Sequence, residues 1–144
     1  MKPVIDHIQI TVKDLKSAES FYDKFLPLLG FDIENKVSAE IEENDFQVVE
    51  YTHPLLSFAI TSPRQAFKND LIHRRKPGAL HHLAFKAGSR SEIDGLHKTL
   101  IKIGAQIVEP PKLYMEYGPD YYALFFKDPE GIKYELVCYE KEGK

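Results

Sequence analysis

The chain has 144 residues, the length of one domain, and its 43% hydrophobic and 28% charged residues are typical of a folded globular protein. Its formal net charge of −3 argues against a nucleic-acid-binding protein, because such proteins usually carry a strongly basic face. The single cysteine excludes an internal disulfide, and no apolar run reaches membrane-spanning or signal-peptide length, so we expect a cytoplasmic protein that binds no membrane.

The first part of the chain predicts a strand, a helix and three more strands. Residues 4–12 alternate in polarity as a half-buried strand does. Asp14 is a candidate N-cap for an amphipathic helix, which Pro27 should interrupt near Phe25 and Gly30 should end. Three further strands are expected at about residues 31–37, 46–51 and 55–60.

A connector without periodicity follows at about residues 63–78. It contains the basic run His73-Arg74-Arg75-Lys76 and ends in Pro77-Gly78. Such charge runs are usually solvated, so the first interpretation is a surface linker. The alternative is an anion-binding edge over a pocket.

The pattern then restarts. Residues 80–87 predict a strand, and Ser89 with Glu92 forms a capping-box pattern before a helical stripe that Gly104 ends. The remaining strands are expected at about residues 105–108, 121–127 and 132–139, with a long loop over residues 109–120.

The last two strands flank the tetrad Asp128-Pro129-Glu130-Gly131, which is typical of a type I turn and predicts a β-hairpin. The returning strand carries Glu135 between apolar neighbours. A carboxylate there is unfavourable to bury unless a partner pairs with it. The sequence therefore predicts a partner for Glu135 elsewhere in the chain.

The two β-α-β-β-β patterns form an internal repeat that superimposes His7 on His82. We expect an α+β fold in which two such modules, about residues 1–62 and 79–140, form one domain with a curved mixed sheet around a central cavity. If Glu135 faces the same cavity as the two histidines, the three side chains provide a ligand set for a divalent metal with open positions for substrate.

The sequence resembles the vicinal oxygen chelate superfamily, which contains glyoxalases, bleomycin and fosfomycin resistance proteins and extradiol dioxygenases. The resemblance covers nearly all of residues 1–144. It rests on DHIQITVKDLKSAESFYDKFLPLLGF, LHHLAFKAGSRSEIDGLHKTLIKIGA and YYALFFKDPEGIKYELV. It implies metal ligands at His7, His82 and Glu135, and a homodimer.

One ligand position departs from the glyoxalase pattern. In lactoylglutathione lyase the last strand of the first module supplies a second carboxylate. Here the matching position is expected at Phe58 or Ser57, neither of which is a strong ligand, and Glu50 lies on the preceding strand. A three-ligand set is more similar to that of the fosfomycin-modifying enzymes or the extradiol dioxygenases, although the dioxygenases usually have twice as many modules.

The function predicted first is that of a glyoxalase-like lyase or transferase, in which Zn, Ni, Mn or Fe chelates a small oxygen-bearing substrate. Glu135 and Tyr122 are the candidate catalytic residues, and Gln9 and Tyr122 the candidate substrate-binding residues. One alternative is an Fe(II) extradiol-type dioxygenase. The other is a metal-free protein that binds a small molecule or an antibiotic, as bleomycin resistance proteins do.

Overall fold

The computed structural model describes residues 1–141 and divides the chain into two compact units, Met1–Leu71 and Ile72–Lys144. The boundary falls inside the connector expected at residues 63–78. Unit 1 contains β1 (His7–Thr11), α1 (Leu15–Phe25), the 3-10 helix η1 (Leu26–Leu29), β2 (Asp32–Ile41), η2 (Glu42–Asn44), β3 (Phe46–Thr52), β4 (Ser57–Thr61) and η3 (Gln65–Phe67). Unit 2 contains β5 (Leu83–Lys86), α2 (Arg90–Lys102), β6 (Gln106–Leu113), β7 (Tyr122–Lys127) and β8 (Lys133–Cys138).

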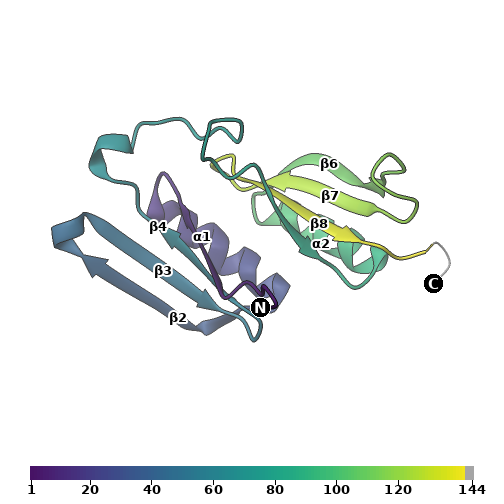
Figure 1. Ribbon diagram of the computed structural model, residues 1–144, viewed down its shortest axis with the longest axis horizontal. Helices are drawn as coiled ribbons and strands as arrows, with labels where there is room; N and C mark the ends of the chain where they lie inside the picture. Colours follow the sequence, from purple (N-terminus) through teal and green to yellow (C-terminus); the bar gives the residue numbers. More distant parts are fainter. Residues whose placement is uncertain (142–144) are drawn as a thin grey trace. The chain divides into compact units, whose positions relative to one another are not determined.

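Each unit has one mixed four-stranded sheet with the same topology (Figure 1). The strand order is β1-β4-β3-β2 in unit 1 and β5-β8-β7-β6 in unit 2. In both sheets the first strand runs parallel to the last, and the other neighbours are antiparallel. The α+β class and the two β-α-β-β-β modules predicted from the sequence are confirmed.

Helix α1 begins and ends where the sequence predicts. The Asp14 side chain accepts a hydrogen bond from the backbone N–H of Ser17 at 2.8 Å, which satisfies a free N–H of the first turn. Helix α1 ends at Phe25, Pro27 lies in the 3-10 helix that follows, and Gly30 has a left-handed φ of 92°.

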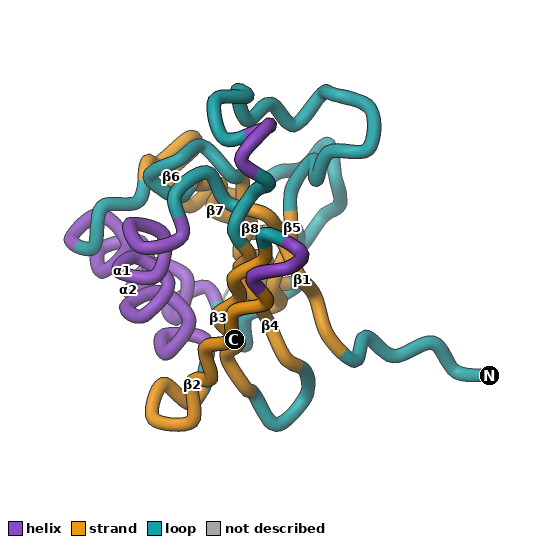
Figure 2. Tube along the Cα trace, turned by 90° about the vertical axis from the view of Figure 1, so that its left-hand side faces the viewer, coloured by secondary structure: helices purple, strands orange, loops and turns teal. Residues whose placement is uncertain are grey.

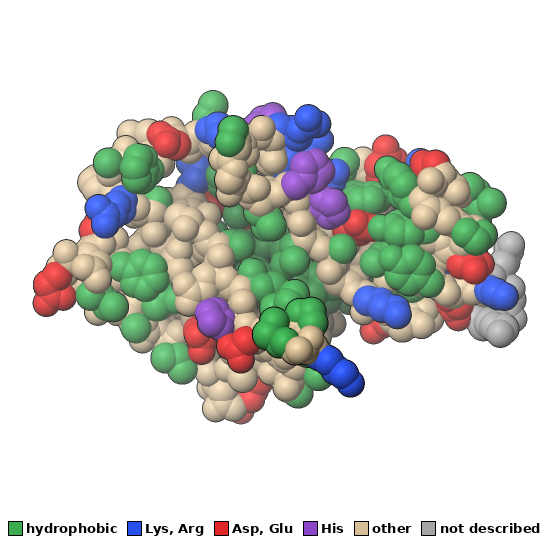
Figure 3. Space-filling model, in the orientation of Figure 1, with side chains coloured by type: hydrophobic (Ala, Val, Ile, Leu, Met, Phe, Trp, Pro, Cys, Tyr) green, Lys and Arg blue, Asp and Glu red, His purple; other side chains and the backbone are tan. Residues whose placement is uncertain are grey.

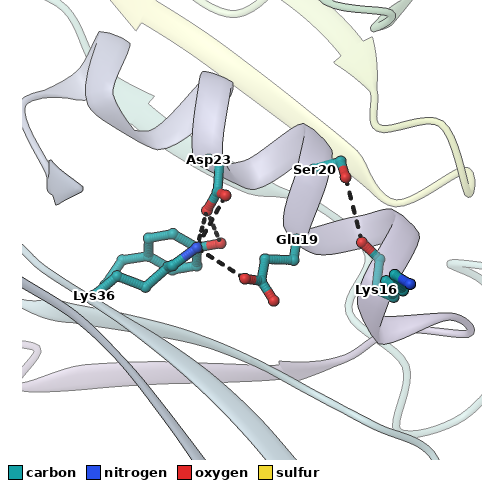
Figure 4. A network of polar contacts seen from close by, with 6 residues as sticks. Lys16, Glu19, Ser20, Asp23 and Lys36 are labelled. Carbon is teal, nitrogen blue, oxygen red and sulfur yellow. Dashed lines mark hydrogen bonds and ion pairs between the residues drawn. The ribbon is translucent and has the colours of Figure 1, made fainter. Parts of the chain in front are cut away.

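Aromatic packing and a polar network hold α1 to its sheet. The ring of Tyr22 stacks on Phe58 of β4, with the ring centroids 5.9 Å apart. The Nζ atom of Lys36 in β2 lies 2.8 Å from a carboxylate oxygen of Glu19 and 3.0 Å from one of Asp23. Figure 4 draws these contacts as dashed lines. The hydroxyl of Tyr51, a fully buried residue of β3, donates to Asp23 at 2.8 Å. This network connects the helix to two strands.

Figure 2 shows helix α2, in purple, to one side of the orange strands of its unit. Its buried residues include Ile93 and Leu100. The Ser89 hydroxyl accepts from the N–H of Glu92 at 3.0 Å, as the capping-box pattern predicts. The Glu92 carboxylate accepts from the N–H of Gly88 at 2.7 Å. Of the helices in the described residues, none combines the length and apolar composition needed to cross a membrane.

The long loop expected at residues 109–120 is partly wrong, because β6 continues to Leu113. Its two prolines, Pro110 and Pro111, argue against a strand in sequence alone. Because β6 is the edge strand of its sheet, a missing N–H can be tolerated there, and its register with β7 shifts on either side of Glu109.

The predicted hairpin between β7 and β8 is confirmed. The N–H of Gly131 donates to the carbonyl of Asp128 at 3.0 Å, the bond that closes a type I turn. The buried Asp128 side chain accepts three more backbone bonds, from Glu130, Gly131 and Ile132, at 3.0, 2.9 and 2.8 Å. This turn fixes the start of β8 and with it the position of Glu135.

Candidate functional site

The alternation of β8 separates Glu135 from the core beneath α2. Tyr134 and its neighbour Phe126 stack with ring centroids 5.6 Å apart, whereas Glu135 points to the other face of the sheet. There it lies between Ala84 of β5 and Phe125 of β7, its partners in the two ladders. Glu135 is only 2% exposed, so its carboxylate needs partners within the fold.

Two side chains supply these partners. The hydroxyl of Tyr121 donates a hydrogen bond to Oε1 of Glu135. The Nε2 atom of His82 lies 3.2 Å from Oε2. His82 precedes β5 instead of lying inside it, because the strand expected at residues 80–87 begins only at Leu83. The structure brings together these two of the predicted ligands.

The separation between His82 and Glu135 suits a shared metal ion. With metal–ligand bonds of about 2.0–2.2 Å, two ligand atoms at adjacent positions lie about 2.8–3.1 Å apart on an octahedral ion and about 3.3–3.6 Å apart on a tetrahedral ion. A charge-assisted N–H···O bond is typically about 2.7–2.9 Å long. The 3.2 Å separation lies between the two ranges for metal ligands, and the imidazole and carboxylate are suitable donors for a borderline divalent ion.

Tyr121 is the site residue that sequence reasoning missed. Tyr122, which was predicted, donates instead to Asp94 on α2 at 2.6 Å, and the Arg90 guanidinium lies 5.1 Å from its ring centroid. Strand parity is the signal that distinguishes the two tyrosines, because Tyr121 shares its parity with Phe125 and hence the face of Glu135. Burial and then the bond to Glu135 raise the pKa of Tyr121, so its phenol remains a neutral donor.

An aromatic wall continues this face away from Glu135. Tyr114, Ala123 and Val137 form a buried cluster against which Tyr121 and Phe125 pack. The rings of Tyr114 and Phe125 meet edge to face with centroids 5.4 Å apart. Burial, followed by the charge of Glu109, raises the pKa of Tyr114 to about 12. The wall gives the carboxylate an apolar surrounding that could contact the apolar part of a ligand.

Basic side chains lie near His81, the neighbour of His82 in the chain. The Nδ1 atoms of His81 and His82 are 2.7 Å apart, so one ring donates to the other. Lost solvation, the His82 ring and the charge of Arg74 lower the pKa of His81. Burial, followed by the charges of Arg74 and Lys127, lowers the pKa of Lys133. The charge of Arg74 thus acts on both His81 and Lys133.

The other predicted residues belong to unit 1. His7 is the first residue of β1; its side chain is 58% exposed, and its Nδ1 lies 2.7 Å from Oδ2 of Asp6. Gln9 is exposed and shares the strand face of His7. Among residues 1–141, no group of three His, Cys, Asp or Glu side chains is gathered so that it could hold a metal ion.

The expected match of Phe58 or Ser57 to Glu135 is wrong. Gln9 pairs with Ala59 in unit 1, as Ala84 pairs with Glu135 in unit 2, so the repeat places Ala59 at the position of Glu135. Phe58 is fully buried against Tyr22 of the helix. Ala59 has no ligating atom, although the half-buried Glu50 lies directly opposite it on β3.

Comparisons with known proteins give one consistent result. Residues 4–136 match the Glyoxalase/Bleomycin resistance protein/Dioxygenase superfamily. The uncharacterised protein YqjT of Bacillus subtilis is 31% identical over 134 residues, which are 92% of this chain and 96% of that protein. A candidate glyoxalase from Bacillus halodurans is 28% identical with a TM-score of 0.73, covering 95% of this chain and 96% of that chain. A domain from Frankia, described as glyoxylase/bleomycin resistance protein/dioxygenase, has the same fold, with a TM-score of 0.77. It is 24% identical, and the match covers 97% of this chain and 99% of that chain.

Proposed function

The chain belongs to the Glyoxalase/Bleomycin resistance protein/Dioxygenase superfamily, and we propose that it is a metal-dependent enzyme whose divalent ion is held by His82 and Glu135. The observation that carries the proposal is the 3.2 Å separation between Nε2 of His82 and Oε2 of Glu135. Glu135 is only 2% exposed, so its carboxylate needs a partner. His7 is proposed as a third ligand because the internal repeat superimposes it on His82. The ion would be Zn, Ni, Mn or Fe.

Each side chain of the site has a distinct role in this proposal. A bound divalent ion polarises the oxygen atoms of a substrate that it chelates. To bind the ion, His82 would use Nε2, and its Nδ1, 2.7 Å from Nδ1 of His81, would then carry the proton donated to that ring. Tyr121 holds Oε1 of Glu135, so the carboxylate keeps one orientation.

The proposed catalytic residues lie on the sheet face that carries Glu135. Glu135 stays the proposed catalytic residue because its Oε2 atom, which the Tyr121 bond leaves available, would hold the ion that binds the substrate. Tyr121 takes the hydrogen-bonding role first predicted for Tyr122, whose hydroxyl is engaged by Asp94. Gln9, exposed on β1, is retained as a substrate-binding residue on the strength of the repeat. The substrate is a small oxygen-bearing molecule whose apolar part contacts the aromatic wall.

A metal-free binding protein is the second candidate. It is favoured by one observation: without an ion, the Tyr121 hydroxyl donates to Oε1 of Glu135 and His82 lies within ion-pair distance of Oε2. In that case the aromatic wall is the binding surface and the carboxylate a structural group.

By analogy with the superfamily we propose a homodimer in either case, which light scattering tests.

Elemental analysis of protein purified without chelators separates the two functions. Near-stoichiometric divalent metal in the wild type supports the enzyme, whereas metal-free folded protein supports the binding protein. For the metal-loaded protein, oxygen uptake with Fe(II) identifies a dioxygenase, and turnover that requires glutathione identifies a lyase or transferase.

A further inference from the structure

A basic cluster lies next to the His82–Glu135 pair. We define it as Arg74, Arg75 and Lys133, all within unit 2. Lys133 lies two residues before Glu135 on the same face of β8, and its Nζ is 5.0 Å from the ring centroid of Phe125. The Phe125 ring in turn meets the ring of His82, with the centroids 6.4 Å apart. The charge of Arg74 acts on both Lys133 and His81.

The cluster lacks a carboxylate that would neutralise it. Within residues 72–141, no ion pair joins Arg74, Arg75 or Lys133 to an acidic side chain. Arg74 is half-buried, and its Nε atom is buried without a hydrogen-bond partner among the described residues. The charge of Glu135 acts on Lys133, but its carboxylate oxygens contact Tyr121 and His82.

The positive charge of this cluster contrasts with the negative net charge of the whole protein. The protein as a whole carries a net charge of −3, so it has more acidic than basic side chains. Figure 3 shows Lys and Arg side chains next to His side chains on part of the surface. Like charges held together raise the free energy of the fold unless solvent or an anion compensates them, and a half-buried guanidinium is poorly solvated.

We propose that the basic cluster binds an anionic group of the substrate, a carboxylate, phosphate or phosphonate, beside the His82–Glu135 pair. This inference rests on the proposed function and adds the class of substrate. Arg74 offers a planar fork that matches two oxygens of such a group, and Lys133 adds a point charge over the apolar ring of Phe125. The substrate is therefore a small molecule with one anionic end and chelating oxygens next to it.

A titration of the metal-free protein with inorganic phosphate tests the cluster. NMR of the Arg74 side chain and calorimetry measure the binding. We expect saturable binding that weakens as NaCl is raised. Arg74→Gln and Lys133→Gln should each weaken it about tenfold, the loss of one charge-assisted contact. Arg74→Lys, which keeps the charge, should lose less. Lys98→Gln, which removes an exposed charge from α2, should leave the affinity unchanged.

The outcomes distinguish this inference from the proposed function. Absence of saturable phosphate binding, or equal weakening by Lys98→Gln and Lys133→Gln, would overturn the anion site even if the protein holds a metal. Phosphate binding that survives in Glu135→Gln and disappears in Arg74→Gln would support the anion site even if the protein holds none.

Discussion

The Nε2 atom of His82 lies 3.2 Å from Oε2 of Glu135 because β5, which begins at the residue after His82, is the neighbour of β8 in one sheet. Strand β5 runs parallel to β8 with Ala84 opposite Glu135, and His82 lies two residues before Ala84 on the same side of the chain. The pair thus depends on the register of a parallel ladder within unit 2. Any substitution that preserves this ladder can be used to test the pair without loss of the fold.

Tyr121→Phe should destabilise the protein by about 1.5–3 kcal/mol, because it removes the hydroxyl donor of a buried carboxylate. Tyr122→Phe is the matched control and should lower the free energy of unfolding by about 1 kcal/mol or less, since its partner Asp94 is exposed and water can replace the lost donor. Urea unfolding measures both. Equal losses would contradict the assignment of Tyr121 to the carboxylate.

The stability of the protein should fall at alkaline pH. Burial and then the bond to Asp94 raise the pKa of Tyr122 to about 12, and burial raises that of Tyr114 to about 12. In the unfolded chain a tyrosine titrates near pH 10, so the unfolded state loses these protons first. The stabilisation is complete below about pH 10 and is lost between there and about pH 12.

Unfolding free energies across this range should therefore decrease less steeply in Tyr122→Phe than in the wild type. A spectrophotometric titration of the phenols should show a late phase that this variant reduces. An identical slope in the two proteins would show that Tyr122 titrates as it does in water.

Two glycine substitutions should have opposite effects on stability. Gly30 has φ 92°, and an added Cβ would lie 3.1 Å from Nε2 of His53, so Gly30→Ala should cost about 1–2 kcal/mol. Gly95 lies inside α2 with no atom within 4 Å of an added Cβ, so Gly95→Ala should stabilise by about 0.5–1 kcal/mol. Thermal unfolding compares the two. A loss in Gly95→Ala would indicate a contact that α2 does not show.

Asp128→Ala should cost about 2–4 kcal/mol, because three backbone N–H groups of the turn lose their acceptor. Asp128→Asn keeps an oxygen at that place and should cost less than half as much. Chemical denaturation measures both variants, and similar losses would argue that the negative charge, and not the acceptor atom, stabilises the turn.

Local patterns in the sequence predicted most of the elements, since caps, turns and periodicity act within a few residues. Asp14, Gly30 and Ser89 mark element ends correctly for this reason. The extension of β6 through Pro110 and Pro111 could not be predicted, because tolerance of proline depends on the edge position of the strand in the sheet.

The candidate site was predicted in part. The pairing of His82 with Glu135 followed from the repeat and strand parity, both visible in the sequence. Sequence reasoning named Tyr122, whereas the structure places Tyr121 against Glu135, and it named Phe58 where the repeat register gives Ala59, a difference of one residue each. A shift of one residue reverses the face of a strand, and the register that decides it is set by neighbouring strands and not by local sequence.

The most direct test of the site is a calorimetric titration of chelator-treated protein with Zn²⁺ and Mn²⁺, in the wild type and in Glu135→Gln. Asp94→Asn serves as the control, because it alters a carboxylate of the same unit on the helix side of the sheet. We predict one ion per chain in the wild type and in the control, and affinity lower by about 100-fold or more in Glu135→Gln. Equal affinity of the wild type and Glu135→Gln, or no binding by the wild type, would contradict the claim that Glu135 and His82 hold a metal.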